Sequence, residues 1–187
     1  MSGVDRIRRQ QVLREAEGYL DLVSLFEGEW SPSAVSTARL ANRCLDVLDR
    51  LPSNVAAGGP ASFLRGQALR LLGRYSDAIA PLREAADSEP SDIESRLALG
   101  WCYKRSGKLS LAIESLEEAL AIDASQAIVH YNLACYWSLA QHLDHALRYL
   151  SQALTMDEKY RLLIESESDF DPIRSDPGFQ SLIGMIV

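Results

Sequence analysis

Two histidines have the spacing best suited to metal chemistry. His142 and His145 are separated by two residues in the run QHLDH. This spacing can place both imidazoles on one helix face, where they can bind zinc. However, no third ligand lies nearby in the sequence, and Asp144 between them suits the first turn of a helix. We therefore expect no metal site here.

A cysteine and a histidine can also form a nucleophile and its base. Cys135 follows His130 by five residues, which does not place the two on one helix face, and no oxyanion-binding loop accompanies them. Cys135, Cys44 and Cys102 all lie in apolar helical patterns, and none forms a CxxC pair. We interpret all three as small buried residues in a reducing compartment.

The acidic run ESESDFD, residues 165–171, contains carboxylates of the kind that bind cations. It lacks the alternating ligands and the turn glycine of a calcium loop, so we expect a solvated connector. The sequence also lacks GxGxxG, GxxxxGK[ST] and GxSxG motifs. We therefore expect neither an enzyme nor a bound cofactor.

The overall composition indicates a folded, acidic protein. Of 187 residues, 47% are hydrophobic, and the formal net charge is -7. This balance disfavours general attraction to nucleic acid or to an anionic membrane. No apolar run approaches the roughly 18 residues that a membrane span needs, and the N-terminus lacks a secretory pattern. The sequence thus predicts a cytoplasmic protein without a membrane span.

The strongest signal is an internal period of 34 residues. Three similar stretches begin at Leu64, Ala98 and Asn132. Small residues in equivalent positions predict closely packed helix pairs, and glycines near the end of the first helix suit a left-handed turn. The matching columns are Gly66, Gly100 and Ala134; Gly73, Gly107 and Gln141; Ala78, Ala112 and Ala146; Leu82, Leu116 and Leu150; Ala85, Ala119 and Ala153.

These columns resemble the tetratricopeptide repeat. The resemblance implies an all-α fold, an α-α superhelical solenoid of antiparallel helix pairs. The sequence departs from the family pattern in lacking the aromatic near the start of the first helix, the third turn glycine and the last helix-ending proline. The residues at these positions are Ser62, Arg96, His130, Gln141 and Glu158.

Both ends of the chain differ from the repeats. Residues 5–26 and 33–51 read as two helices of a divergent pair, interrupted by EGEWSP at 27–32, and residues 53–60 read as a loop. The run DFDPIRSDPGFQ resembles a helical cap found after many bacterial repeat arrays. The predicted parts of one continuous solenoid domain are an N-terminal pair (1–58), three repeats (59–92, 93–126 and 127–157) and a C-terminal capping segment (158–187).

In the tetratricopeptide family, the first helices of successive pairs line a concave groove. The inward-facing positions here combine aromatic and basic residues, which suits a peptide carrying acidic groups. Alternatively, the aromatics pack between repeats and the bases are merely solvated. The candidate groove residues are Phe63, Gln67, Arg70, Leu97, Trp101, Lys104, Arg105, Tyr131, Asn132 and Ser138, with Cys135 on the same face.

The resemblance favours an adaptor or assembly factor that binds another protein through this groove. The alternative is a structural module that associates with copies of itself. The family's carboxylate clamp for chaperone tails is incomplete, because Ala98 stands where a second asparagine would match Asn132. We therefore do not predict recognition of a heat-shock chaperone C-terminus.

Overall fold

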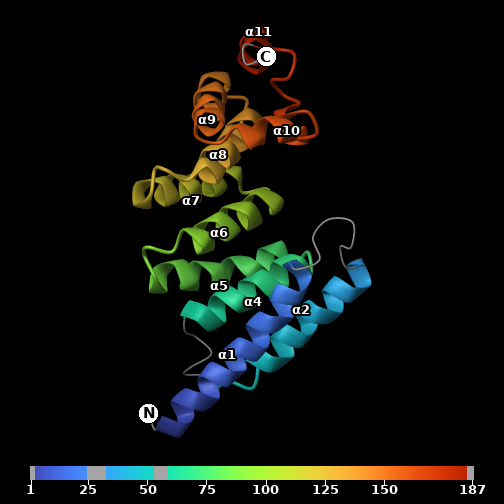
Figure 1. The fold of residues 1–187 in the computed structure, drawn as a ribbon, viewed down its shortest axis with the longest axis vertical. Coiled ribbons are helices and arrows are strands. Elements are labelled where there is room, and N and C mark those ends of the chain that lie inside the picture. Colours follow the sequence, from blue (N-terminus) through green and yellow to red (C-terminus); the bar gives the residue numbers. More distant parts are fainter. Residues whose placement is uncertain (1–2, 25–32, 53–58, 185–187) are drawn as a thin grey trace. The chain divides into compact units, whose positions relative to one another are not determined.

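A computed structural model describes residues 3–24, 33–52 and 59–184, and these residues form helices and turns without a strand (Figure 1). They belong to two compact units, Met1–Ser106 and Gly107–Val187. None of the described helices is both long and apolar enough to cross a bilayer. The first unit contains α1 (Gly3–Ser24), α2 (Ala34–Leu48), α4 (Gly59–Leu71), α5 (Tyr75–Ser88) and α6 (Ile93–Arg105). The second contains α7 (Leu109–Ile122), α8 (Ala127–Leu139), α9 (Leu143–Met156), η1 (Glu158–Tyr160), α10 (Arg161–Ile164), η2 (Ser168–Phe170) and α11 (Pro177–Gly184).

The N-terminal pair has the two predicted helices, with shifted ends. Helices α1 and α2 run antiparallel (Figure 1), and Ser33 caps α2 by accepting a hydrogen bond from the Ser36 amide at 3.2 Å. The interruption EGEWSP lies outside the described residues. So does most of the predicted loop 53–60, but its last two residues, Gly59 and Pro60, open α4 instead. Proline is tolerated there because the first helical amides have no partner within the helix.

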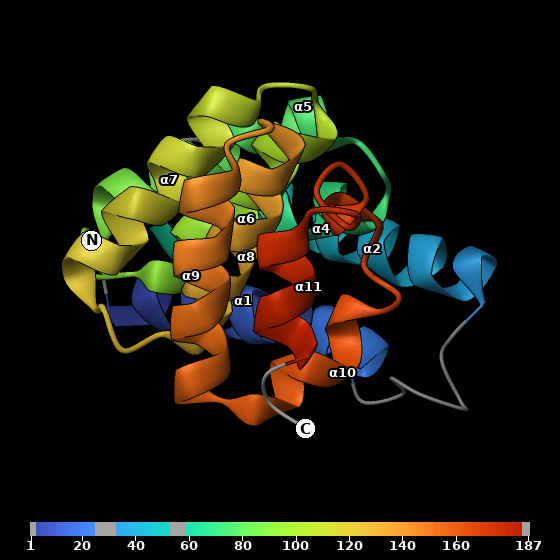
Figure 2. The same cartoon turned by 90° about the horizontal axis from the view of Figure 1, so that it is seen from above.

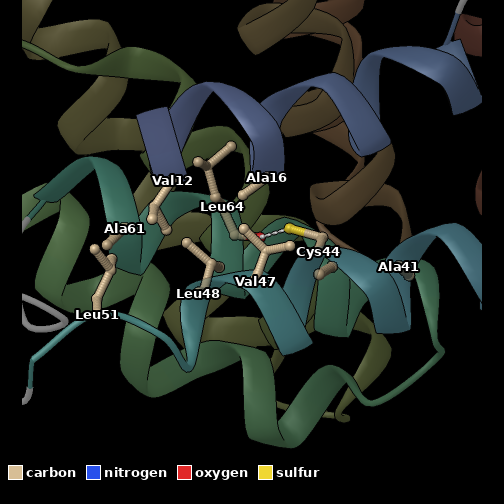
Figure 3. Packing of buried hydrophobic residues seen from close by; sticks show 10 residues of the cluster. Val12, Ala16, Ala41, Cys44, Val47, Leu48, Leu51, Ala61 and Leu64 are labelled. Atoms are coloured by element: carbon tan, nitrogen blue, oxygen red, sulfur yellow. Dashed lines mark hydrogen bonds between the residues drawn. The ribbon is translucent and has the colours of Figure 1, made fainter. Parts of the chain in front are cut away.

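The core of the first unit begins where α1 and α2 pack against α4 (Figure 3). Cys44 on α2 is fully buried, and its thiol points toward the carbonyl oxygen of Leu64, at 3.9 Å. Val12 and Ala16 cover this layer from α1. The small residues in the layer let the three helices approach closely.

The repeat columns form the core, as the period predicts. All nine alanines and leucines of the three second-helix columns are at most 2% exposed. In the first repeat, Gly66 faces Leu82 so closely that a Cβ on Gly66 would lie 2.4 Å from the leucine Cγ. The glycine therefore sets the spacing of α4 and α5.

The turns between paired helices use the left-handed conformation. Gly73 and Gly107 have φ of 71° and 73°. Gln141 occupies the same position in the third repeat with φ of 59°, although it has a side chain. For a residue with a Cβ, this conformation costs roughly 1–2 kcal/mol.

In the second unit, the segment after α9 folds back over the last helix pair. Helix α11 lies beside α9 (Figure 2), and η2 contacts α8. Phe170, Ile173 and Phe179 are buried, and Leu182 and Ile183 are half-buried. This segment therefore completes the core of the second unit, whereas the domain boundaries themselves stay predictions.

Candidate functional site

Two arginines converge on one tryptophan in the first unit. The Arg70 Cζ lies 5.4 Å and the Arg105 Cζ 5.6 Å from the centre of the Trp101 ring. Tyr75 meets Trp101 edge-on, with ring centres 5.0 Å apart, and the Arg105 Cζ lies 5.0 Å from the Tyr75 ring. We call Arg70, Tyr75, Trp101 and Arg105 the basic–aromatic cluster.

Three helices position this cluster. Arg70 belongs to the last turn of α4, and Tyr75 opens α5 just after the Gly73 turn. Trp101 and Arg105 are four residues apart on α6, so they share one helix face. The Gly73 turn therefore brings the end of α4 next to the start of α5, and the packing of α6 on α5 adds the end of α6.

The polar contacts of the cluster leave both guanidinium groups able to bind an anion. Arg70 donates through Nε to Gln67 Oε1 at 2.7 Å, and Arg105 Nη2 lies 3.5 Å from the Tyr75 hydroxyl. Among the described residues, no carboxylate forms an ion pair with Arg70 or Arg105. A guanidinium held against an aromatic face still presents N–H groups that can bind a carboxylate in a bidentate manner.

The cluster thus unites three of the predicted groove residues, Arg70, Trp101 and Arg105, and a fourth, Gln67, accepts a hydrogen bond from Arg70. Lys104 and Leu97 are half-buried on the same helix as Trp101. Phe63 lines a hollow of about 390 Å³ with Gly59, Pro60, Ala85 and Ser88. The rim of this hollow is acidic, with Glu89, Asp92 and Glu94, so the first unit also offers a site of opposite charge.

The remaining predicted groove residues belong to the second unit, where burial removes two of them from the accessible surface. Tyr131 is 3% exposed, and its ring stacks on Tyr160 with centres 4.9 Å apart. Ser138 is fully buried. Asn132 is half-buried. Tyr131 is therefore a core residue under the C-terminal segment and not a peptide anchor, because the residues that cover it follow the last repeat.

The residues first considered for chemistry have structural contacts. His145 stacks on Trp137 at 4.5 Å and His142 meets the same ring edge-on at 5.3 Å, so the tryptophan holds both imidazoles. His130 is buried and hydrogen-bonds through Nε2 with the Ala124 carbonyl at 2.9 Å. These are packing and hydrogen-bonding contacts within the fold.

All three cysteines are buried thiols. Burial raises the pKa of Cys44 to about 12 and that of Cys102 to about 11, with nearby arginines opposing the shift in each case. Thiols with so high a pKa are poor nucleophiles near neutral pH.

Sequence reasoning missed Tyr75. The equivalent positions in the other two repeats are Leu109 and Leu143, so an aromatic stands where the array otherwise has leucine. Only this change within a column distinguishes Tyr75 before the structure is known.

Comparison with known proteins agrees with the repeat pattern. The family model for the tetratricopeptide repeat matches residues 53–93 and 63–127. Residues 53–127 therefore match tetratricopeptide repeats. No curated protein matches it.

Several solved structures share the fold of this chain. A structure titled "Crystal structure of MamA" has a TM-score of 0.60 at 18% identity, covering 85% of this chain and 96% of that one. A structure titled "Crystal structure of YrrB: a TPR protein with an unusual peptide-binding site" has a TM-score of 0.61 at 17% identity, covering 84% of each chain. At this identity the likeness establishes the α-α solenoid fold alone.

Proposed function

We propose that this chain is a protein-interaction scaffold that binds an acidic segment of a partner protein at the basic–aromatic cluster. The observation that carries the proposal is the pair of guanidinium groups that pack on Trp101 without an ion-pair partner among the described residues. The aromatic rings fix the two arginines in place, which lowers the entropy lost when an anion binds.

The chemistry of the cluster favours an acidic peptide over nucleic acid. The chain carries a formal net charge of -7, which repels a polyanion at long range. A short acidic segment needs only local positive charge, and aromatic residues with arginine are the usual anchors of protein interfaces. The structure titled for YrrB has a peptide-binding site on the same fold, which is consistent with this mode of binding.

The test uses fluorescently labelled acidic peptides and matched basic peptides, with binding followed by fluorescence anisotropy. The acidic peptides should bind and the basic ones should not. Affinity should fall as salt is added, because the charges are near the surface. Replacing Arg105 by alanine should weaken binding by about tenfold or more, the effect of losing a charged hydrogen bond. Arg105→Lys should recover only part of the lost affinity, because lysine lacks the planar set of N–H donors of a guanidinium group.

The matched control is Arg50→Ala, which removes an arginine that pairs with Glu15 elsewhere in the first unit. This variant should bind like the wild type. Equal binding by Arg105→Ala and the wild type, or equal binding of acidic and basic peptides, would contradict the proposal. If a second copy of the chain supplies the acidic segment, the average molecular mass in solution will rise with protein concentration. Arg105→Ala will then abolish this rise.

A further inference from the structure

Four residues of the acidic run 165–171 are exposed, as expected of a solvated connector, but Glu167 and Asp169 are half-buried. In the second unit, η2 brings Glu167 and Asp169 against Cys135 on α8. One ligand atom from each residue, the Cys135 sulfur and a carboxylate oxygen of each acid, lies within 4.8 Å of the other two. We call these three residues the thiol–carboxylate cluster.

The backbone of η2 fixes the two carboxylates. The Asp169 amide donates to Glu167 Oε1 at 3.1 Å, which closes a turn around Ser168. Arg174 donates to the carbonyl oxygens of Glu167 and Ile164, at 2.7 and 3.2 Å, and pairs with Asp171. The Arg174 side chain therefore anchors this loop by binding the carbonyl oxygens of the loop backbone.

Tyr131 provides an independent observation at the same place. It precedes Cys135 by one turn of α8, and its ring meets Phe170, the neighbour of Asp169, edge-on with centres 5.8 Å apart. The Tyr131 hydroxyl is buried and makes no hydrogen bond within the described part of the chain. Tyr131 and Cys135 are four residues apart on α8, so they share one helix face. A buried hydroxyl without a partner is costly and calls for a ligand.

We propose that Cys135, Glu167 and Asp169 bind a divalent zinc-type cation, with the Tyr131 hydroxyl donating a hydrogen bond to a ligand oxygen. One thiolate and two carboxylates form a ligand set that zinc accepts, with a fourth position left for water. The three ligand atoms lie within 4.8 Å of one another, so a shift of roughly 1 Å would bring them to a common ion at zinc–sulfur and zinc–oxygen distances of about 2.3 and 2.0–2.2 Å. A hydrogen bond from tyrosine to a bound carboxylate or water is a common supporting contact.

Binding releases the thiol proton of Cys135 to solvent, since only the thiolate is a ligand. The ion would also join α8 to the segment that follows α9. Bound metal would therefore raise the free energy of unfolding. Once the metal concentration exceeds the dissociation constant, this gain grows with the logarithm of the metal concentration. This site lies wholly in the second unit, so its test is independent of the peptide proposal.

The experiment titrates the metal-free 187-residue chain with Zn²⁺ by calorimetry and with Co²⁺ by absorption spectroscopy. We expect about one equivalent of metal, tighter binding at higher pH, and a thiolate-to-cobalt charge-transfer band. Glu167→Gln and Asp169→Asn should each weaken binding by at least about tenfold. Cys135→Ser should remove the charge-transfer band. The melting temperature should rise with Zn²⁺ in the wild type and rise less in Glu167→Gln.

The matched controls are Glu165→Gln, an exposed residue of the same acidic run, and Cys102→Ser, a buried cysteine of the other unit. Both should bind metal like the wild type. The absence of stoichiometric binding, or equal binding by Glu167→Gln and the wild type, would overturn the proposal. So would a charge-transfer band that survives in Cys135→Ser and disappears in Cys102→Ser. Glu167 is only partly buried, so its glutamine variant should fold even if Cys135→Ser does not.

Discussion

The close approach of α4 and α5 at Gly66 makes a quantitative prediction about Gly66→Ala. A Cβ there would lie 2.4 and 2.6 Å from the Cγ and Cδ2 atoms of Leu82. Leu82 is fully buried, so its side chain has no open space to move into. Overpacking of this kind costs about 1–3 kcal/mol. Alanine gains about 1 kcal/mol over glycine within a helix, so the net loss of folding free energy should be about 0–2 kcal/mol.

Gly18→Ala is the matched control. Gly18 is also inside a helix, α1, but nothing lies within 4 Å of the position its Cβ would take. This variant should be about 1 kcal/mol more stable than the wild type. Both variants gain the higher helix propensity of alanine. The difference in stability between them, about 1–3 kcal/mol, therefore measures the cost of overpacking alone.

The assay is urea unfolding followed by far-ultraviolet circular dichroism, comparing midpoints at equal slope. Leu82→Ala should be less harmful in the Gly66→Ala background than in the wild type, since the added methyl group fills part of the cavity. If Gly66→Ala is as stabilising as Gly18→Ala, Gly66 does not set the spacing of the helices. If Leu82→Ala lowers the stability by the same amount in both backgrounds, residues 66 and 82 do not interact.

Three further predictions concern individual residues. Gln141→Gly should stabilise the chain by about 0.5–1 kcal/mol in urea unfolding, because relief of roughly 1–2 kcal/mol of left-handed strain exceeds the entropic cost of glycine; a loss of stability would contradict this. Native thiols should resist iodoacetamide at mildly alkaline pH, because the pKa values of Cys44 and Cys102 are raised to about 12 and 11, and should all react in urea. Rapid labelling of the folded chain would refute that burial. Hydrogen bonds from Ser125 and Gln126 lower the pKa of Asp123, so its contribution to stability is present above the unfolded pKa, about 4, and is lost as the pH falls through the folded value. Asp123→Asn should therefore make the acid-induced drop in the urea midpoint shallower, and an unchanged drop would show that Asp123 does not contribute.

The regular part of the fold was predictable because each repeat column has a local physical cause. Small residues such as Ala78 report close helix contacts, and glycines such as Gly73 report left-handed turns. The start of α4 was misplaced because Gly59 and Pro60 look like loop residues and yet suit the first turn of a helix.

The candidate sites were only partly predictable. Trp101 and Arg105 share a helix face by their spacing, so their proximity follows from the sequence. Glu167 reaches Cys135 through an irregular turn 32 residues later, after the period has ended, and no spacing rule applies there. The sequence left open whether Tyr131 lines a groove or packs in the core, because the residues that cover it, Tyr160 and Phe170, come after the last repeat.

The folding of the C-terminal segment over α8 has a consequence for synthesis on the ribosome. The second unit buries Tyr131 under Tyr160 and Phe170, and Phe170 in turn contacts Phe179. These partners are translated up to 48 residues after Tyr131, so the apolar face of α8 stays uncovered until they leave the exit tunnel. Arresting the nascent chain when α8 has left the tunnel but residues 160–179 have not should therefore increase its capture by factors that bind exposed apolar surface.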